Sequence, residues 1–162
     1  MNTTFEDRTS TGKDEWLTPP EIVRRWDISI TTRALPINAP RTFADKNYTT
    51  VDNGLIQPWS GRTWCNPPYG QKAMWEFTKR CVENKNATLL TFARTDTRLF
   101  HEQIFPNAVA ILFIKGRLRF YHVDGRQADY AGAPSYLIAF DEYNALMLEQ
   151  SGLKGAFVRL RF

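Results

Sequence analysis

Hydrophobic and polar positions along the chain separate into one helical stripe and several short extended runs. In Gln71–Asn84, apolar or small side chains recur at i, i+3, i+4 and i+7 from Met74, which is the spacing of an amphipathic helix. Ala87–Ala93 and Ala108–Ile114 are mostly apolar, as expected for strands that are covered on both faces of a sheet. The pattern therefore predicts a helix and two buried strands in the middle of the chain.

Shorter elements are predicted on both sides of this region. The expected strands are Asp27–Thr32, Tyr48–Val51, Arg62–Cys65, Pro134–Phe140 and Phe157–Phe162. The expected helices are Glu21–Trp26, Thr97–Phe105 and Asp141–Ser151. Strands that alternate with helices indicate βαβ units in an α/β fold with a parallel sheet, where ligands bind beyond the carboxyl ends of the strands.

Composition fits one globular domain over residues 14–162, preceded by a polar, flexible arm over residues 1–13. The chain has 162 residues, 43% of them hydrophobic, and no apolar run long enough to cross a membrane. Its two cysteines form no disulfide framework and do not have the spacing of metal ligands. We therefore expect a location in the reducing cytoplasm and no bound metal ion. The net charge of +4 is compatible with a nucleic-acid partner without demonstrating one.

The four residues Asn66-Pro67-Pro68-Tyr69 form a stiff loop directly after the strand predicted at Arg62–Cys65. Each proline fixes φ and lacks an N–H group, so the loop presents an amide, backbone carbonyl oxygens and an aromatic ring. Such a set suits a planar ring that carries an amino group, because oxygens accept its hydrogens and the tyrosine can cover its face. A proline-rich turn that only leaves a strand is the simpler alternative for this loop, and its place at a carboxyl strand end favours the binding function.

A second group of interest is basic and aromatic. If Lys115–Tyr121 is extended, Arg117, Arg119 and Tyr121 share one face and the residues between them share the other. Together with Arg126 this ribbon is suited to contacts with phosphates. A solvated edge hairpin, whose charges oppose aggregation, explains the same pattern equally well.

These motifs together resemble the small, phage-type, Dam-like DNA N6-adenine methyltransferases. The resemblance extends from about Asp14 to Phe140. It rests on these segments: Trp16-Leu17-Thr18-Pro19-Pro20, Asp52-Asn53-Gly54-Leu55, Trp64-Cys65-Asn66-Pro67-Pro68-Tyr69-Gly70, Ala93-Arg94-Thr95-Asp96-Thr97, Lys115-Gly116-Arg117-Leu118-Arg119-Phe120 and Ala133-Pro134-Ser135.

The resemblance implies a minimal, Rossmann-like class I methyltransferase sheet and an adenine-specific DNA methyltransferase of the site-specific type. It implies that S-adenosylmethionine is the methyl donor and that DNA is the partner. Asn66 and the Pro67 carbonyl would accept the hydrogens of the N6 amino group of a flipped adenine, Pro68 would stiffen the loop, and Tyr69 would stack on the base.

The resemblance also assigns the remaining site residues. Trp16, Thr18 and Pro19 match the segment that contacts the methionine end of the cofactor, and Asp52 or Asn53 match the position that meets its adenine. Ser29 stands where the family usually has an acidic residue after the first strand, and no Gly-x-Gly loop is present in this region. The residues expected to contact DNA are Arg94, Lys115, Arg117, Arg119 and Arg126.

Several expectations follow for specificity and setting. The assigned elements leave no segment for a separate target-recognition domain, so we expect relaxed sequence specificity with affinity mainly from phosphate contacts. A homodimer would enlarge the DNA-binding surface, and a phage-encoded enzyme would act in the host cytoplasm. Two alternatives stay open: an amino methyltransferase that acts on RNA or glutamine, and a catalytically weakened DNA-binding protein on a methyltransferase fold, suggested by Ser29.

Overall fold

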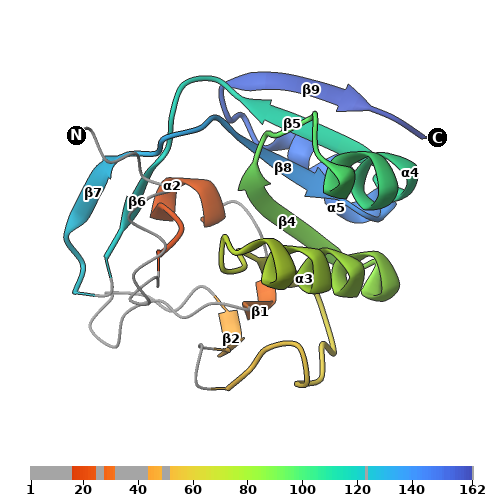
Figure 1. Ribbon diagram of the computed structural model, residues 1–162, viewed down its shortest axis with the longest axis horizontal. Coiled ribbons are helices and arrows are strands. Elements are labelled where there is room, and N and C mark those ends of the chain that lie inside the picture. The colour runs from red at the N-terminus through yellow and green to blue at the C-terminus, as the bar shows by residue number, and fades with distance from the viewer. Residues whose placement is uncertain (1–15, 25–27, 32–43, 49–51, 123, 162) are drawn as a thin grey trace.

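A computed structural model describes residues 16–24, 28–31, 44–48, 52–122 and 124–161, although not the side chains of 28–31 and Asp45. The predicted N-terminal arm lies outside these residues. The described part is a mixed α/β structure with a seven-stranded sheet and a separate two-stranded sheet. Helices lie on both faces of the larger sheet (Figure 1).

The large sheet has the order β2-β1-β3-β4-β8-β5-β9. Its strands are β1 (Ile28–Thr31), β2 (Ala44–Asn47), β3 (Thr63–Cys65), β4 (Ala87–Phe92), β5 (Ala110–Ile114), β8 (Ser135–Ala139) and β9 (Gly155–Arg159). The small sheet pairs β6 (Arg119–Tyr121) with β7 (Gln127–Tyr130). The helical segments are α2 (Pro20–Val23), α3 (Gln71–Asn84), the π-helical η1 (Phe100–Ile104), α4 (Phe105–Asn107) and α5 (Glu142–Gln150).

Strand direction confirms the predicted parallel arrangement for one half of the sheet and corrects it for the other. The strands β2, β1, β3 and β4 are parallel neighbours. However, β8 lies between β4 and β5 and runs antiparallel to both, and β9 runs antiparallel to β5. The sheet is therefore mixed. The carboxyl ends of β3 and β4 still meet at one edge.

Two hydrophobic clusters cover the two faces of the sheet. On one face Phe77 and Cys81 of α3 pack with Leu89 of β4 and Ile104 of η1. On the other face, Leu148 of α5 belongs to a cluster that also holds side chains of the N-terminal segment and of β6. Helix α3 begins after the Asn66–Tyr69 loop and buries the predicted stripe, so this prediction is confirmed together with its bounds.

Three predicted strand positions are wrong or too long. The strand expected at Tyr48–Val51 lies at Ala44–Asn47. Tyr48 is outside it, and residues 49–51 are not described. This strand forms an edge of the sheet, so polar residues are tolerated and the hydrophobic pattern is weak. The strand expected at Phe157–Phe162 begins earlier, at Gly155, and ends at Arg159, because it pairs with β5 from Ile114 onward. Strand β6 begins only at Arg119, after a turn at Gly116 with φ +82°.

The segment before α2 is fixed by β6. Leu17 pairs with Tyr121 in an antiparallel bridge, in which each backbone N–H donates to the other residue's carbonyl at 2.8 and 3.0 Å. The ring of Trp16 lies beside that of His122, with centroids 4.8 Å apart. A segment at the start of the described chain is thereby held against a strand more than 100 residues later.

Candidate active site

Asn66 is the first residue after β3 and is almost completely buried, with 1% of its surface exposed. Its side-chain Nδ2 donates to the Trp16 carbonyl at 3.0 Å and to Thr18 Oγ1 at 3.1 Å. The nitrogen and oxygen of an asparagine amide are hard to tell apart by shape alone. Here two hydrogen-bond acceptors lie around one end of the amide, which identifies that end as Nδ2. The structure therefore brings three of the predicted site residues, Asn66, Trp16 and Thr18, into one network.

The oxygen of the same amide is the chemically informative atom. Asn66 Oδ1 is buried and has no hydrogen-bond partner among the described residues. A buried acceptor without a partner costs about 1–3 kcal/mol, so such atoms are rare unless a ligand or water completes them. Asn66 thus holds a pre-oriented acceptor at the carboxyl end of a strand.

Thr18 helps to hold the Asn66 side chain in this orientation. Its hydroxyl oxygen accepts hydrogen bonds from Asn66 Nδ2 and from Trp64 Nε1, the latter at 3.2 Å. Because the oxygen acts as acceptor in both, the hydroxyl hydrogen of Thr18 is used in neither. Pro19 follows as the residue before α2, and its carbonyl accepts from the Ile22 N–H at 2.9 Å.

Tyr69 lies at the end of the loop with its ring between two other aromatic residues. The ring stacks on Phe92, the last residue of β4, with centroids 4.4 Å apart and an angle of 22° between the planes. Phe120 of β6 meets it edge-on at 6.1 Å. The tyrosine plane is therefore set by the end of the neighbouring strand, while Pro67 is buried and Pro68 partly buried before it.

The other predicted cofactor residues are not joined to this network by the contacts of the described residues. Asp52 and Asn53 are exposed on a turn, where Asn53 has φ +49°. Arg80 of α3 fixes this turn by donating to the Leu55 and Gln57 carbonyls at 3.1 and 2.9 Å. The backbone of Ser29 lies in β1, and its side chain is outside the described residues. The roles of Asp52, Asn53 and Ser29 stay predictions.

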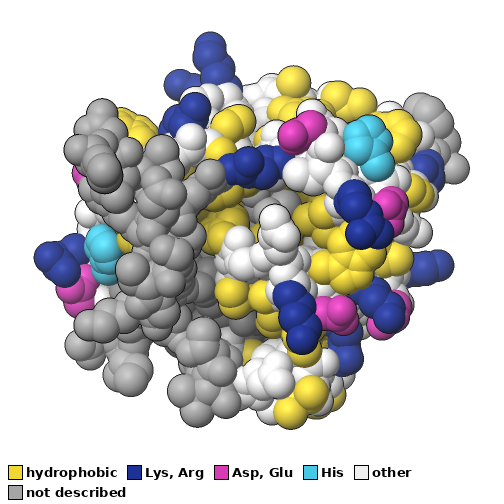
Figure 2. All heavy atoms as spheres, viewed as in Figure 1, with side chains coloured by type: hydrophobic (Ala, Val, Ile, Leu, Met, Phe, Trp, Pro, Cys, Tyr) yellow, Lys and Arg dark blue, Asp and Glu magenta, His cyan; other side chains and the backbone are white. Residues whose placement is uncertain are grey.

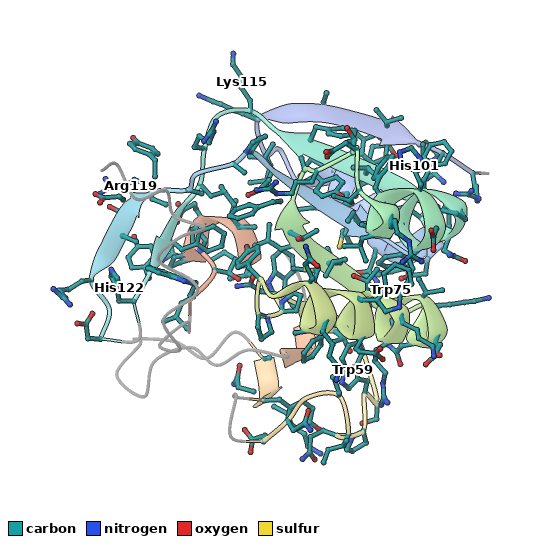
Figure 3. All side chains as sticks on the ribbon, viewed as in Figure 1. Trp59, Trp75, His101, Lys115, Arg119 and His122 are labelled. Atoms are coloured by element: carbon teal, nitrogen blue, oxygen red, sulfur yellow. The ribbon has the colours of Figure 1, made fainter. Side chains whose placement is uncertain are left out.

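The predicted DNA-binding residues fall into two places. Arg94 and Lys115 follow β4 and β5 of the large sheet, whereas Arg117, Arg119 and Arg126 lie on or beside the β6–β7 hairpin, where Figure 3 labels Arg119. Arg117 donates to the Ala131 carbonyl at 3.1 Å and Arg119 Nε donates to the Ala128 carbonyl at 3.0 Å. Lys115 is exposed, and Figure 3 shows it directed away from the sheet.

Arg126 is tied to its own turn rather than to the ribbon face. Its Nε is 2.7 Å from an Asp124 carboxylate oxygen, and its backbone N–H donates to the other oxygen. The backbone and side-chain hydrogen bonds from Arg126 lower the pKa of Asp124. Figure 2 likewise shows acidic side chains interspersed among Lys and Arg on the visible face. The expected basic ribbon is thus partly neutralised.

A cleft of about 650 Å³ opens beside Tyr69, between the start of α3 and the segment after β4. Sequence reasoning did not single out this cleft, nor Phe92 and Phe120 as neighbours of Tyr69. Phe92 lies in the apolar run Ala87–Ala93 and Phe120 on the apolar face of the expected ribbon, but their contact with Tyr69 depends on non-local packing. The cleft is lined by Tyr69, Gln71, Met74, Trp75, Thr91, Phe92, Arg94, Thr97, Arg98, Leu99 and Tyr136.

The described residues contain no group of three or more His, Cys, Asp or Glu side chains placed to hold a metal ion. None of their helices is long and apolar enough to span a membrane.

Comparison with known protein families identifies one match, over residues 6–151, to the family described as DNA N-6-adenine-methyltransferase (Dam). Searches of curated proteins and of solved structures found no match. The matched residues include the Asn66–Tyr69 loop, the Trp16–Thr18 segment that fixes Asn66, and the β6–β7 hairpin. Since the match covers nearly the whole chain, the protein belongs to the Dam family of DNA N-6-adenine-methyltransferases.

Proposed function

We propose that this member of the family transfers a methyl group from S-adenosylmethionine to N6 of adenine in DNA, with Asn66 as the residue that receives the amino group. The observation that carries this proposal is the buried Oδ1 of Asn66, which lacks a partner among the described residues while Nδ2 has two. An adenine N6–H would supply the missing donor.

The chemistry required of the Asn66–Tyr69 loop follows from the properties of the adenine N6 amino group, which accepts the methyl group. The N6 lone pair is delocalised into the purine ring, so the amino group is a weak nucleophile. Hydrogen bonds to Asn66 Oδ1 and to the Pro67 carbonyl would hold both hydrogens, favour a tetrahedral nitrogen and direct its lone pair outward. The rate gain then comes from positioning and from stabilising the positive charge that develops on nitrogen.

Tyr69 would contribute its ring face to the base. Phe92 and Phe120 fix the plane of this ring, and in the proposed complex the ring lies against an adenine that has left the duplex. Extruding a base costs a few kcal/mol, and stacking of about 1–3 kcal/mol per base offsets part of that cost. Phe92 is then a positioning residue because it fixes the plane on which the base rests.

The residues around Asn66 fit the methionine end of S-adenosylmethionine. Thr18 presents a hydroxyl hydrogen that neither of its two accepted bonds uses, and a carboxylate is a suitable acceptor for it. When bound, the cofactor would supply an electrophilic methyl group. Asp52, Asn53 and Ser29 remain the proposed contacts to the rest of the cofactor, on a sheet that we assign to the Rossmann-like class I methyltransferases.

The hairpin supports DNA contact with little sequence selection. A two-stranded ribbon fits the major groove, but Arg117 and Arg119 each use one N–H on a hairpin carbonyl. We therefore propose that they serve mainly as phosphate contacts with Lys115, Arg126 and Arg94, and that specificity is relaxed. A second copy of the chain would extend this surface.

Replacing Asn66 with Ala tests the function. The variant is expected to lose roughly 10²–10³-fold in methyl transfer to DNA, measured with labelled S-adenosylmethionine, because an oriented acceptor is removed. Asn66→Asp keeps an acceptor oxygen and is expected to retain more activity than Asn66→Ala. Circular dichroism of both variants controls for folding.

RNA and a glutamine-containing protein are offered in parallel as acceptors. Transfer to either of them and not to DNA would reject the proposed substrate. Transfer to DNA by Asn66→Ala at close to the wild-type rate would reject the proposed mechanism.

A further inference from the structure

The cleft beside Tyr69 is separate from the Asn66 network. Its floor includes Thr91 and Tyr136, which pair across β4 and β8 and so face the same side of the sheet, the side that α3 covers. Asn66 instead bonds to Trp16, which belongs to the hydrophobic cluster on the opposite face. Tyr69 lines the cleft and also ends the Asn66 loop, so it borders both places.

The chemistry of the cleft is aromatic and cationic. Trp75, Tyr69 and Tyr136 contribute rings, and Arg94 and Arg98 contribute guanidinium groups. The lining residues include no carboxylate among those described. Gln71 adds an amide that can hydrogen-bond to the edge of a base, whereas the Thr97 hydroxyl donates to the Arg94 carbonyl at 2.9 Å and accepts from the Phe100 N–H at 3.3 Å.

The two arginines have different roles. Arg98 is bound through two hydrogen bonds of 2.8 Å to Glu102, and its guanidinium lies 5.4 Å from the centre of the Trp75 ring. Arg98 therefore contacts Trp75, while Glu102 offsets its charge. Arg94 follows Ala93 after the end of β4, is exposed and lines the cleft, and a guanidinium group is a suitable partner for a phosphate. Figure 3 shows Trp75 projecting from α3 on the side of α4.

We propose that this cleft binds a second nucleotide, the immediate neighbour of the target adenine on the same DNA strand. Its base lies against Trp75 and its phosphate on Arg94, while the adenine occupies the far side of Tyr69. This proposal rests on the proposed function, which identifies the bound nucleic acid as a DNA strand. The volume of about 650 Å³ is within the range of sites that hold molecules of this size.

The test measures binding of a labelled single-stranded oligonucleotide of about ten nucleotides with one central adenine, by fluorescence anisotropy, to the full chain without cofactor. Trp75→Ala is expected to raise Kd by about 5-fold to 150-fold, the equivalent of losing one stacked base. Trp75→Phe keeps a ring and is expected to recover most of the affinity.

Abasic substitution identifies the nucleotide. Two further oligonucleotides carry an abasic position immediately 5′ or immediately 3′ of the adenine. For the one that lacks the base bound by Trp75, Trp75→Ala should cause almost no further loss of affinity. A double-mutant cycle of this kind isolates the contact between Trp75 and that base. The proposal would be overturned if Trp75→Ala lowered the affinity equally for the intact strand and for both abasic strands, or lowered it for none of them.

Tyr143→Ala is the matched control. Tyr143 is an exposed aromatic residue on α5 with the Arg62 guanidinium 4.5 Å from its ring, so it resembles Trp75 but belongs to another helix. Its replacement should leave Kd unchanged. Because no methyl transfer is measured, the result is independent of the Asn66 experiment, and failure of the proposed function would be seen there instead.

Discussion

Asn66 and Thr18 act as a pair at the level of single residues. Asn66 can present its oxygen only because its nitrogen has two acceptors, and Thr18 provides one of them. Thr18 also accepts from Trp64, so a single hydroxyl oxygen fixes two buried side chains. We therefore expect the orientation of the proposed acceptor to depend on a residue 48 positions earlier in the chain.

Thr18→Val preserves shape and removes this acceptor. We expect it to lower the free energy of unfolding by about 1–3 kcal/mol, because buried donors lose a partner. Methyl transfer should also fall, since the Asn66 amide then has only the Trp16 carbonyl to orient it. Denaturant unfolding and transfer kinetics measure the two effects separately.

Thr18→Ser is the control, because it keeps the hydroxyl oxygen and should restore both quantities. Full activity in Thr18→Val would show that Thr18 does not orient Asn66. A stability loss without an activity loss would assign Thr18 a structural role alone.

At the level of elements, α5 and β9 are joined by an ion pair whose strength depends on pH. Arg159 of β9 lies 2.9 Å from Glu142 in the first turn of α5. The hydrogen bond from Arg159 lowers the pKa of the Glu142 carboxyl below its ordinary value of 4.5. The stabilisation is therefore present above that value and is lost as the pH falls through the lowered pKa.

Glu142→Gln is expected to lower the Tm slightly at pH 7, and the difference in Tm from wild type should shrink as the pH falls through the lowered pKa of the wild-type carboxyl. Thermal unfolding across this range measures the difference between the two proteins. Glu83→Gln is the control, because the distance from Glu83 to Lys79 is 4.0 Å and both side chains are more than half exposed. A constant difference between Glu142→Gln and wild type at all pH values would exclude the ion pair as its cause.

At the level of the whole molecule, we expect the elements that are proposed to face DNA to set the sequence specificity. The described residues include a two-stranded hairpin, whose arginines are partly engaged with hairpin carbonyls, and a cleft of about 650 Å³. We expect adenines to be methylated in many sequence contexts, with a preference confined to one neighbouring base. Mapping of N6-methyladenine on random DNA measures this, and a strict motif of about four or more bases would contradict it.

The prediction from sequence was most successful where structure is local. Helix α3 has the predicted bounds because its apolar stripe and its start after Gly70 are local signals. Strand β4 was found because its apolar run ends at turn residues, and β3 because the residue before a proline favours extended geometry. Strand β2 was misplaced because an edge strand such as Ala44–Asn47 needs no apolar alternation.

The sequence by itself determined a stiff Asn66–Tyr69 loop after a short strand, because two prolines fix φ locally and the residue before them favours extended geometry. Only the tertiary structure decided that β8 would lie between β4 and β5, since strand pairing over long separations has no periodic signal. It also decided which atom of Asn66 is presented, because that depends on Trp16, 50 residues earlier, held by Leu17 against β6. Hydrogen bonds between distant segments form only when packing brings the segments together, and this packing orients the proposed site.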